Sequence, residues 1–446
     1  MRFSKFSTTF LCTIFLIGVF PVSADFQKKG DKEKTGTALT PPAAVTPYSN
    51  IKRDDLLNGL EIISLEQFSD PLIKCDLVIR AGAMFDLAGK TGLAKLTQET
   101  LLAVNPRLKE ELESLQSSIE WGVDSDTTWF HVETPPDSFE TVFEIIARLL
   151  VVEGIRPEAF KNAYQQHLEL LKTHQSTAAE RADEHFFKAL YGDHPYGHNI
   201  SGNEASVSAI KQGDVYDFMK RFYLANNSSV VITGNVSHTK AMRVFRSYFG
   251  GWVKGSIVPR TFRPPAQVYH ARLVKIEEPG LAKIEIRSGL IGVKHNDQDF
   301  LITQVIANIL AARLQNPQAE FSVIPLPRVL PGPLFVSASV PADQALSFSE
   351  RISESFSSMT TTPVSAEQLA SAKSHLAAEY TSRTTDFFLR EIEVYSFPRN
   401  YPLILASKIE SITVADVQRV AKKLLDANAL TIVVLGDVKE NFKSNP

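Results

Sequence analysis

An internal repeat constrains the fold of this chain more than any other feature. Residues 226–236 and 428–438 each begin at Asn, continue through small and β-branched residues, and end in Gly, a polar residue and Val. Such runs are typical of buried strands that close in a turn. Two unrelated strands could share this pattern, but a candidate helix leads into both, and units repeated in a fixed order indicate duplication. The sequence therefore predicts two tandem homologous domains.

The elements expected in each half indicate an α+β fold. Apolar and mostly polar residues alternate through 72–81 and 283–290, as in half-buried strands, whereas 139–152, 157–172 and 299–314 carry the apolar faces of helices. Further strands are expected at 60–68, 120–132 (as a pair), 228–232, 272–278, 334–340 and 430–435, and further helices at 92–102, 107–119, 177–190, 213–222, 237–249 and 342–359, with others beginning at Ser365 and Thr413. Each domain should be a mainly antiparallel sheet with helices packed on one face.

The first 24 residues have the pattern of an export signal. Arg2 and Lys5 form a basic end, residues 10–20 are an apolar run, and residues 22–24 fit a small-residue cleavage site. The run is too short to span a bilayer comfortably, so a cleaved signal peptide is favoured over an uncleaved anchor. The mature chain is expected to be periplasmic or secreted.

Composition favours a packed protein with more than one domain. Of 446 residues, 44% are apolar and 22% are charged, and this length predicts two or three domains. The polar stretch 25–50 is expected to be a disordered leader, and the Pro-rich stretch 253–268 a linker between domains at 51–252 and 269–446. The net charge of −3 gives no reason to expect nucleic acid or an anionic membrane. Cys75 alone remains after cleavage, so an internal disulfide is excluded.

The helix expected at 92–102 carries a polar group of unusual composition. Lys95 and Glu99 are four residues apart and share a helix face, with Gln98 beside Glu99. The ordinary interpretation is a solvated ion pair, which stabilises a helix by a few tenths of a kcal/mol.

This helix resembles the zinc helix of the insulinase, pitrilysin and mitochondrial-processing-peptidase family, in which Gly-led residues precede the inverted motif His-x-x-Glu-His. Here the motif positions read Lys95-x-x-Gln98-Glu99. Similar pieces follow the family's order at Asn58-Gly59-Leu60, Pro71, Gly82, Gly92-Leu93-Ala94, 191–197 and 413–438. The resemblance implies two α/β halves that form a clam-like half-chamber. In the smaller bacterial and mitochondrial branch, a catalytic chain pairs with one whose zinc site is degenerate.

The residues at the motif positions lack the chemistry that the family motif supplies. The ammonium of Lys95 has no lone pair for a metal, and the amide of Gln98 cannot take a proton from a zinc-bound water. Glu99 could ligate a metal, but it would be one ligand of three. The resemblance places the third ligand, a Glu, on a later helix, where Glu169 is the nearest match. We therefore expect no catalytic residue, no bound metal and no cofactor on this chain.

Two further hypotheses concern metals. Lys95 could occupy the space of the missing cation and pair with Glu99. The pairs His194 and His198, and His167 and His174, are weaker candidates for a zinc site, because the first lies in a predicted loop and the second shares a helix face only approximately.

The family's pair of substrate-gripping residues also looks degenerate. The resemblance places an Arg and a Tyr in the second half, where this chain has Arg313, one residue out of register, and Phe321, which lacks the hydroxyl. Four prolines follow between residues 325 and 333. Peptide gripping by these residues is therefore not expected.

These observations favour a non-catalytic zinc-peptidase homologue. Its expected partner is a catalytic subunit with an intact His-x-x-Glu-His motif and the zinc, and the pair would degrade or process peptides in the periplasm. One alternative is an active zinc metallopeptidase with substituted ligands such as Glu99, Glu169 and a distant His. The other is a stand-alone periplasmic protein that binds unfolded peptides or acts as a scaffold.

Overall fold

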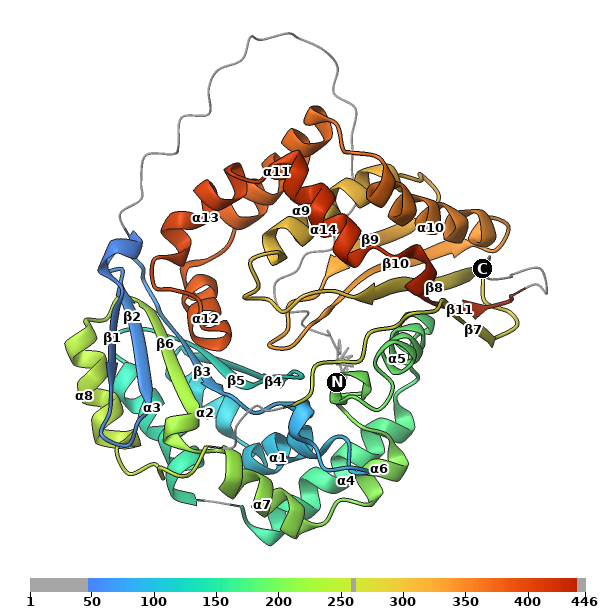
Figure 1. The fold of residues 1–446 in the computed structure, drawn as a ribbon. Coiled ribbons are helices and arrows are strands. Elements are labelled where there is room, and N and C mark those ends of the chain that lie inside the picture. The colour runs from blue at the N-terminus through green and yellow to red at the C-terminus, as the bar shows by residue number, and fades with distance from the viewer. Residues whose placement is uncertain (1–46, 154, 258–261, 439–446) are drawn as a thin grey trace, which may run out of the picture.

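The computed structural model describes residues 47–153, 155–257 and 262–438, and it shows a mixed α+β fold with two separate sheets (Figure 1). The predicted signal peptide and most of the predicted leader lie outside the described residues, as does part of the predicted linker. Among the residues that are described, no helix is both long and apolar enough to cross a membrane.

The strands are β1 Lys52–Asp55, β2 Glu61–Glu66, β3 Ile73–Ile79, β4 Ser118–Val123, β5 Thr128–Thr134, β6 Ser228–Gly234, β7 Arg272–Glu277, β8 Lys283–Ile291, β9 Glu320–Pro325, β10 Pro333–Pro341 and β11 Thr431–Gly436. The helices are α1 Leu93–Leu102, α2 Leu108–Ser114, α3 Phe139–Ala147, α4 Pro157–Thr173, α5 Ala178–Tyr191, α6 Glu204–Ser208, α7 Gln212–Phe222, α8 His238–Phe249, α9 Phe300–Arg313, α10 Ala345–Thr361, α11 Ala366–Thr381, α12 Thr385–Tyr395, α13 Tyr401–Glu410 and α14 Val414–Leu424. The capping boxes expected at Thr177, Ser365 and Thr413 are present.

The two sheets have the same topology. The first has the order β1-β2-β6-β3-β5-β4, and the second has the order β7-β11-β8-β10-β9. In each sheet the closing strand, β6 or β11, runs parallel to the first strand of the repeated unit, and the other pairings within that unit are antiparallel. The α+β fold with two homologous, mainly antiparallel sheets is therefore confirmed.

The closing strands match in their hydrogen bonds as well as in their sequence. Gly234 and Gly436 end these strands at φ values of 108° and 143°, a region that favours glycine. The carbonyl of Gly234 accepts from the Gln67 N–H at 2.9 Å, and the carbonyl of Gly436 accepts from the Glu278 N–H at 2.9 Å. Both carbonyls also accept from the N–H two residues later. The repeated turn therefore directs the chain out of both sheets in the same way.

Each sheet is covered on its second face by one helix from the opposite half. α12 packs against β3 and β6 of the first sheet, and α5 packs against β8 and β11 of the second (Figure 1). On α5, Phe186 stacks on Phe335 of β10 with ring centroids 5.0 Å apart. The sequence pattern predicts helices on one face of each sheet only. It does not predict that each half contributes a helix to the second face of the other half's sheet, which we call the exchange of α5 and α12.

The exchange explains a difference in the burial of β3. Its alternating sequence predicts a half-buried strand, yet nearly all of its residues are buried. Asp76, on the face expected to be solvated, is 3% exposed and accepts a hydrogen bond of 2.7 Å from Nδ1 of His131. The cover that α12 provides is the physical reason, because it comes from a segment far away in the sequence.

We predict that Gly234→Ala lowers the free energy of unfolding by about 3 kcal/mol, because the new Cβ would lie 2.1 Å from the Leu72 carbonyl oxygen and the left-handed backbone would be strained. Gly213→Ala in α7 is the matched control. No described atom lies within 4 Å of its Cβ, so the change should be neutral or slightly stabilising. Urea unfolding measures both, and equal effects of the two changes would contradict the prediction.

Candidate functional site

Helix α1, which carries Lys95, Gln98 and Glu99, is held firmly at its N-terminus. Gly92 precedes the helix in the left-handed region at φ 96°, and a Cβ there would lie 2.7 Å from the Ser201 carbonyl oxygen. The carboxylate of Asp86 accepts hydrogen bonds from the N–H groups of Gly92 and Ala94, both at 2.7 Å. Burial raises the pKa of the Asp86 carboxyl to about 7, although these donors oppose the rise. One face of α1 packs into the core, so the motif face has a fixed direction.

Lys95 and Glu99 form the ion pair that their spacing predicts. The Lys95 Nζ lies 3.5 Å from Oε1 of Glu99, and the two side chains are 26% and 22% exposed. They are therefore half-buried, unlike a freely solvated pair on a helix surface.

Glu99 also pairs with His167 of α4. Oε2 of Glu99 lies 2.6 Å from His167 Nδ1, and His167 Nε2 lies 2.8 Å from the Ser201 carbonyl oxygen. A carbonyl accepts hydrogen bonds only, and a carboxylate does too, so both ring nitrogens must donate and the ring is an imidazolium. Burial lowers the pKa of His167, but the hydrogen bond and charge of Glu99 outweigh it, and the pKa is raised overall. We call Lys95, Glu99 and His167 the charged triad.

Gln98 is buried and serves the structure. Its Nε2 donates to the carbonyl oxygens of Gly122 on β4 and Trp129 on β5, at 3.1 and 3.2 Å. Its Oε1 is buried, and the described residues offer it no hydrogen-bond donor. The amide at the position of the family's catalytic Glu therefore ties α1 to the edge of the first sheet.

The residue that meets Glu99 from α4 is His167 and not Glu169. Glu169 is exposed, and its carbonyl accepts from the Thr173 hydroxyl. The buried residues of α4 include Ala159, Ala163 and His167, which are spaced four apart along one face. Glu169 falls on the opposite face. This periodicity is the sequence signal for His167, which the sequence analysis considered only as a partner of His174.

The residues present do not fit a zinc ion. Lys95 has no lone pair, and both nitrogens of His167 carry protons that are engaged. Glu99 accepts from His167 and forms an ion pair with Lys95. Among the residues that the structure describes, no three His, Cys, Asp or Glu side chains are grouped as metal ligands would be. His194 instead accepts from the Tyr196 N–H, and His174 lies 3.4 Å from Glu180. The charged triad therefore offers ion pairs where the resemblance implies a metal centre.

The degenerate gripping positions are engaged inside the second half. The Arg313 guanidinium contacts the Ser358 hydroxyl at 3.0 Å, and partial burial lowers the pKa of Arg313. Phe321 is 7% exposed and packs against Phe348 with ring centroids 5.6 Å apart. Both side chains therefore stabilise the packing of the second half.

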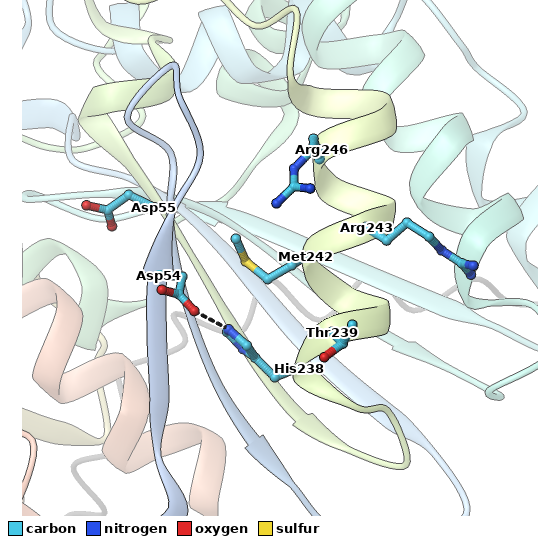
Figure 2. A pocket seen from close by; sticks show the side chains of 7 residues that line it. All are labelled: Asp54, Asp55, His238, Thr239, Met242, Arg243 and Arg246. Atoms are coloured by element: carbon cyan, nitrogen blue, oxygen red, sulfur yellow. Dashed lines mark hydrogen bonds and ion pairs between the residues drawn. The ribbon is translucent and has the colours of Figure 1, made fainter.

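A pocket of ≈ 430 Å³ lies between the β1–β2 hairpin and α8, away from the charged triad (Figure 2). It is lined by Asp54, Asp55, His238, Thr239, Met242, Arg243 and Arg246. His238 bridges Asp54 and the Ser64 hydroxyl, each at 2.7 Å, and Arg243 points away from this pair (Figure 2). The pocket holds an internally paired His and Asp, and it shares no residue with α1.

We predict that Glu99→Gln destabilises the protein in a pH-dependent way. A histidine with a raised pKa contributes stability below its unfolded pKa of about 6.5 and loses it as the pH rises through the folded value. The variant should therefore lose about 2 kcal/mol at about pH 6 and less at about pH 9, as measured by urea unfolding. Glu169→Gln is the exposed control and should change little at either pH. A pH-independent effect of Glu99→Gln would argue against an imidazolium.

Known proteins share sequence or fold with this chain. A family model described as the inactive domain of peptidase M16 matches residues 209–376. An uncharacterised zinc protease from Rickettsia bellii is 20% identical over 211 residues, which are 46% of this chain and 51% of that protein. Mitochondrial-processing peptidase subunit beta from Blastocladiella emersonii is 19% identical over 235 residues, 52% of this chain and 50% of that protein. The chain thus spans about half the length of these relatives.

Solved structures share the fold over most of the chain. A peptidase M16 inactive domain from Pseudomonas fluorescens has a TM-score of 0.79 at 18% identity, covering 87% of this chain and 98% of that one. The periplasmic protease PqqL from Escherichia coli has a TM-score of 0.72 at 15% identity, covering 87% of this chain and 47% of that one. The chain is therefore similar to M16 peptidases in fold over most of its length, and it matches the model of their inactive domain over residues 209–376.

Proposed function

We propose that this chain is a non-catalytic M16 homologue that completes the chamber of a periplasmic, heteromeric metallopeptidase. Its partner would be a catalytic subunit with an intact His-x-x-Glu-His motif, which supplies the zinc and the base. The observation that carries the proposal is the charged triad, in which the side chains at the ligand positions pair with one another.

The chemistry of peptide hydrolysis explains why the triad matters. A zinc peptidase needs a Lewis acid to polarise the carbonyl and a base to activate water. Here a buried amide replaces the base, and an ammonium and an imidazolium lie on either side of the one carboxylate. The alternative of substituted ligands is disfavoured, because Glu169 is exposed and Glu99 is fully engaged.

The proposals of pairing and location rest on separate observations. The fold is retained over most of the chain although the chemistry is absent, which is expected if the chain still shapes a chamber for another subunit. One relative is named as a subunit of a processing peptidase, and one fold neighbour is named as a periplasmic protease. The export-signal pattern of residues 1–24 supports the same compartment.

We predict that four substitutions create a zinc site at these positions. The variant Lys95→His/Gln98→Glu/Glu99→His/His167→Glu should bind about one zinc per chain, because it places imidazole and carboxylate ligands at three facing positions. The matched control carries the same first three changes with His167→Ala, because a retained His167 could itself be the third ligand. It keeps Glu169, which faces away, and should bind zinc far more weakly.

Elemental analysis of the dialysed proteins measures this directly. Stoichiometric zinc in the wild-type chain, lost on substitution of Glu99, would contradict the proposal. Equal zinc in the His167→Glu and His167→Ala variants would show that Glu169 is the third ligand position after all.

We predict that the chain purified alone cleaves no peptide and that, from its native host, it co-purifies with an M16 chain that has an intact motif. A stable pair of this kind should bury an interface of more than about 1,000 Å². Chelator-sensitive cleavage by the isolated chain would favour the active-enzyme alternative. A persistent monomer with no peptidase partner, yet with bound peptides, would favour the scaffold.

A further inference from the structure

The joint between the two halves contains a buried cluster of four charged side chains. Glu393 lies on the face of α12 that packs against the first sheet, and its side chain is fully buried. Its Oε2 lies 3.4 Å from NH2 of Arg53 on β1 and 3.4 Å from NH2 of Arg80, directly after β3. Glu61 on β2 takes the closer contacts with both arginines, at 3.2 Å with Arg53 and closer still with Arg80.

Both carboxyl groups contact the same guanidinium nitrogens of Arg53 and Arg80, so the cluster brings Glu61 and Glu393 together. Oε1 of Glu393 is buried, and no described residue donates to it. A carboxylate buried with one bare oxygen and two long contacts is poorly solvated, whereas a protonated carboxyl can donate to Glu61. The geometry therefore suits one proton shared by the pair.

Electrostatics agree with this distribution. Burial raises the pKa of the Glu393 carboxyl to about 7, with Glu61 adding to the rise and the two arginines opposing it. Burial also opposes ionisation of Glu61, but Arg80 and Arg53 outweigh it, so the pKa of Glu61 is lowered. The pKa values of the two carboxyls are thus shifted in opposite directions, which is typical of a pair that holds one proton.

The opposite face of α12 fixes it to the second half. There the buried Glu391 pairs with His295, whose ring packs between Phe300 and Tyr395 at 4.4 and 4.3 Å. If α12 separates from the first sheet, it should therefore move with the second half. The contact that can open is the one that Glu393 makes.

We propose that Glu61 and Glu393, held between Arg53 and Arg80, form a proton-linked latch between the two halves, and that loss of the shared proton loosens α12 from the first sheet. The contribution of Glu393 is fully present below the unfolded carboxyl pKa of about 4.5 and is lost as the pH rises through about 7. The pKa of Glu61 is lowered, so this carboxyl stays ionised over the same range. The joint is therefore tighter in mildly acidic than in mildly alkaline conditions.

Two other titratable groups near α12, Asp386 and His131, also have raised pKa values, so the stabilisation that they contribute also falls as the pH rises. Burial and the charge of Asp76 raise the pKa of Asp386 at the start of α12, with His131 and Lys74 opposing the rise. Burial lowers the pKa of His131, but Asp76, Asp386 and Glu133 outweigh it. Comparing variants at the same pH removes these contributions.

Hydrogen–deuterium exchange of the full-length chain tests the latch. The readout is the exchange rate of the backbone N–H groups of α12 in the wild type, divided by the rate in Glu393→Gln at the same pH. The Gln side chain is the reference because its neutral amide mimics the protonated carboxyl of Glu393. Linkage between a folded pKa of about 7 and an open-state value of about 4.5 predicts that this ratio rises about tenfold between about pH 6 and about pH 8.

Two further variants make the test specific. Glu61→Gln should also remove the pH dependence, because the remaining carboxylate then has two guanidinium groups to itself; this variant decides the matter if Glu393→Gln does not fold. Asp54→Asn is the matched control, since Asp54 neighbours Arg53 on β1 but pairs with His238 on the other face (Figure 2). It should keep the wild-type pH dependence. A ratio that stays constant with pH, or an equal change in Asp54→Asn and Glu61→Gln, would overturn the proposal.

Discussion

The exchange of α5 and α12 between the halves is the constraint on which the structure depends. A sheet with helices on one face leaves a second apolar face, and here each half covers the other's. Polar contacts accompany the apolar ones. Arg287 of β8, 2% exposed, pairs with Asp183 of α5, and Glu393 of α12 meets Arg53 and Arg80. Breaking such buried pairs one partner at a time is costly, so the halves are joined by interactions that are specific as well as strong.

The charged triad joins α1 and α4 at the positions where the family resemblance implies a zinc site. The triad carries two cations and one carboxylate, and the carboxylate bridges α1 and α4 as a shared ligand would. Gln98 replaces a charge by an amide that donates to two strand carbonyls. Gln98 and Glu99 thus hydrogen-bond to other protein groups, and Lys95 forms an ion pair with Glu99. A buried polar group without a partner would cost about 1–3 kcal/mol, so these contacts stabilise the side chains where they lie.

The sequence predicts the repeated strands, the capped helices and the position of α1, because these follow from local periodicity and turn chemistry. It does not predict the burial of Asp76 or the exchange of α12, because these depend on contacts between distant segments. At the site, the Lys95–Glu99 pair follows from spacing alone. The partnership of Glu99 with His167 does not, because a motif carried over by family resemblance directs attention to Glu169. The buried face of α4, counted by residue, would have indicated His167.

The degenerate site and the joint between the halves meet at Trp129. Its carbonyl oxygen accepts from Gln98, and its ring lies 5.3 Å from the Arg390 guanidinium of α12. Gly122 leaves room for that ring, since a Cβ there would come within 2.5 Å of it. The contacts of the charged triad lie within the first half, whereas Arg390 moves with α12. Opening of the joint would therefore uncover the Trp129 ring while the triad stays in place. This would separate a rigid charged triad from a movable α12, an arrangement that suits the proposed chamber-completing role.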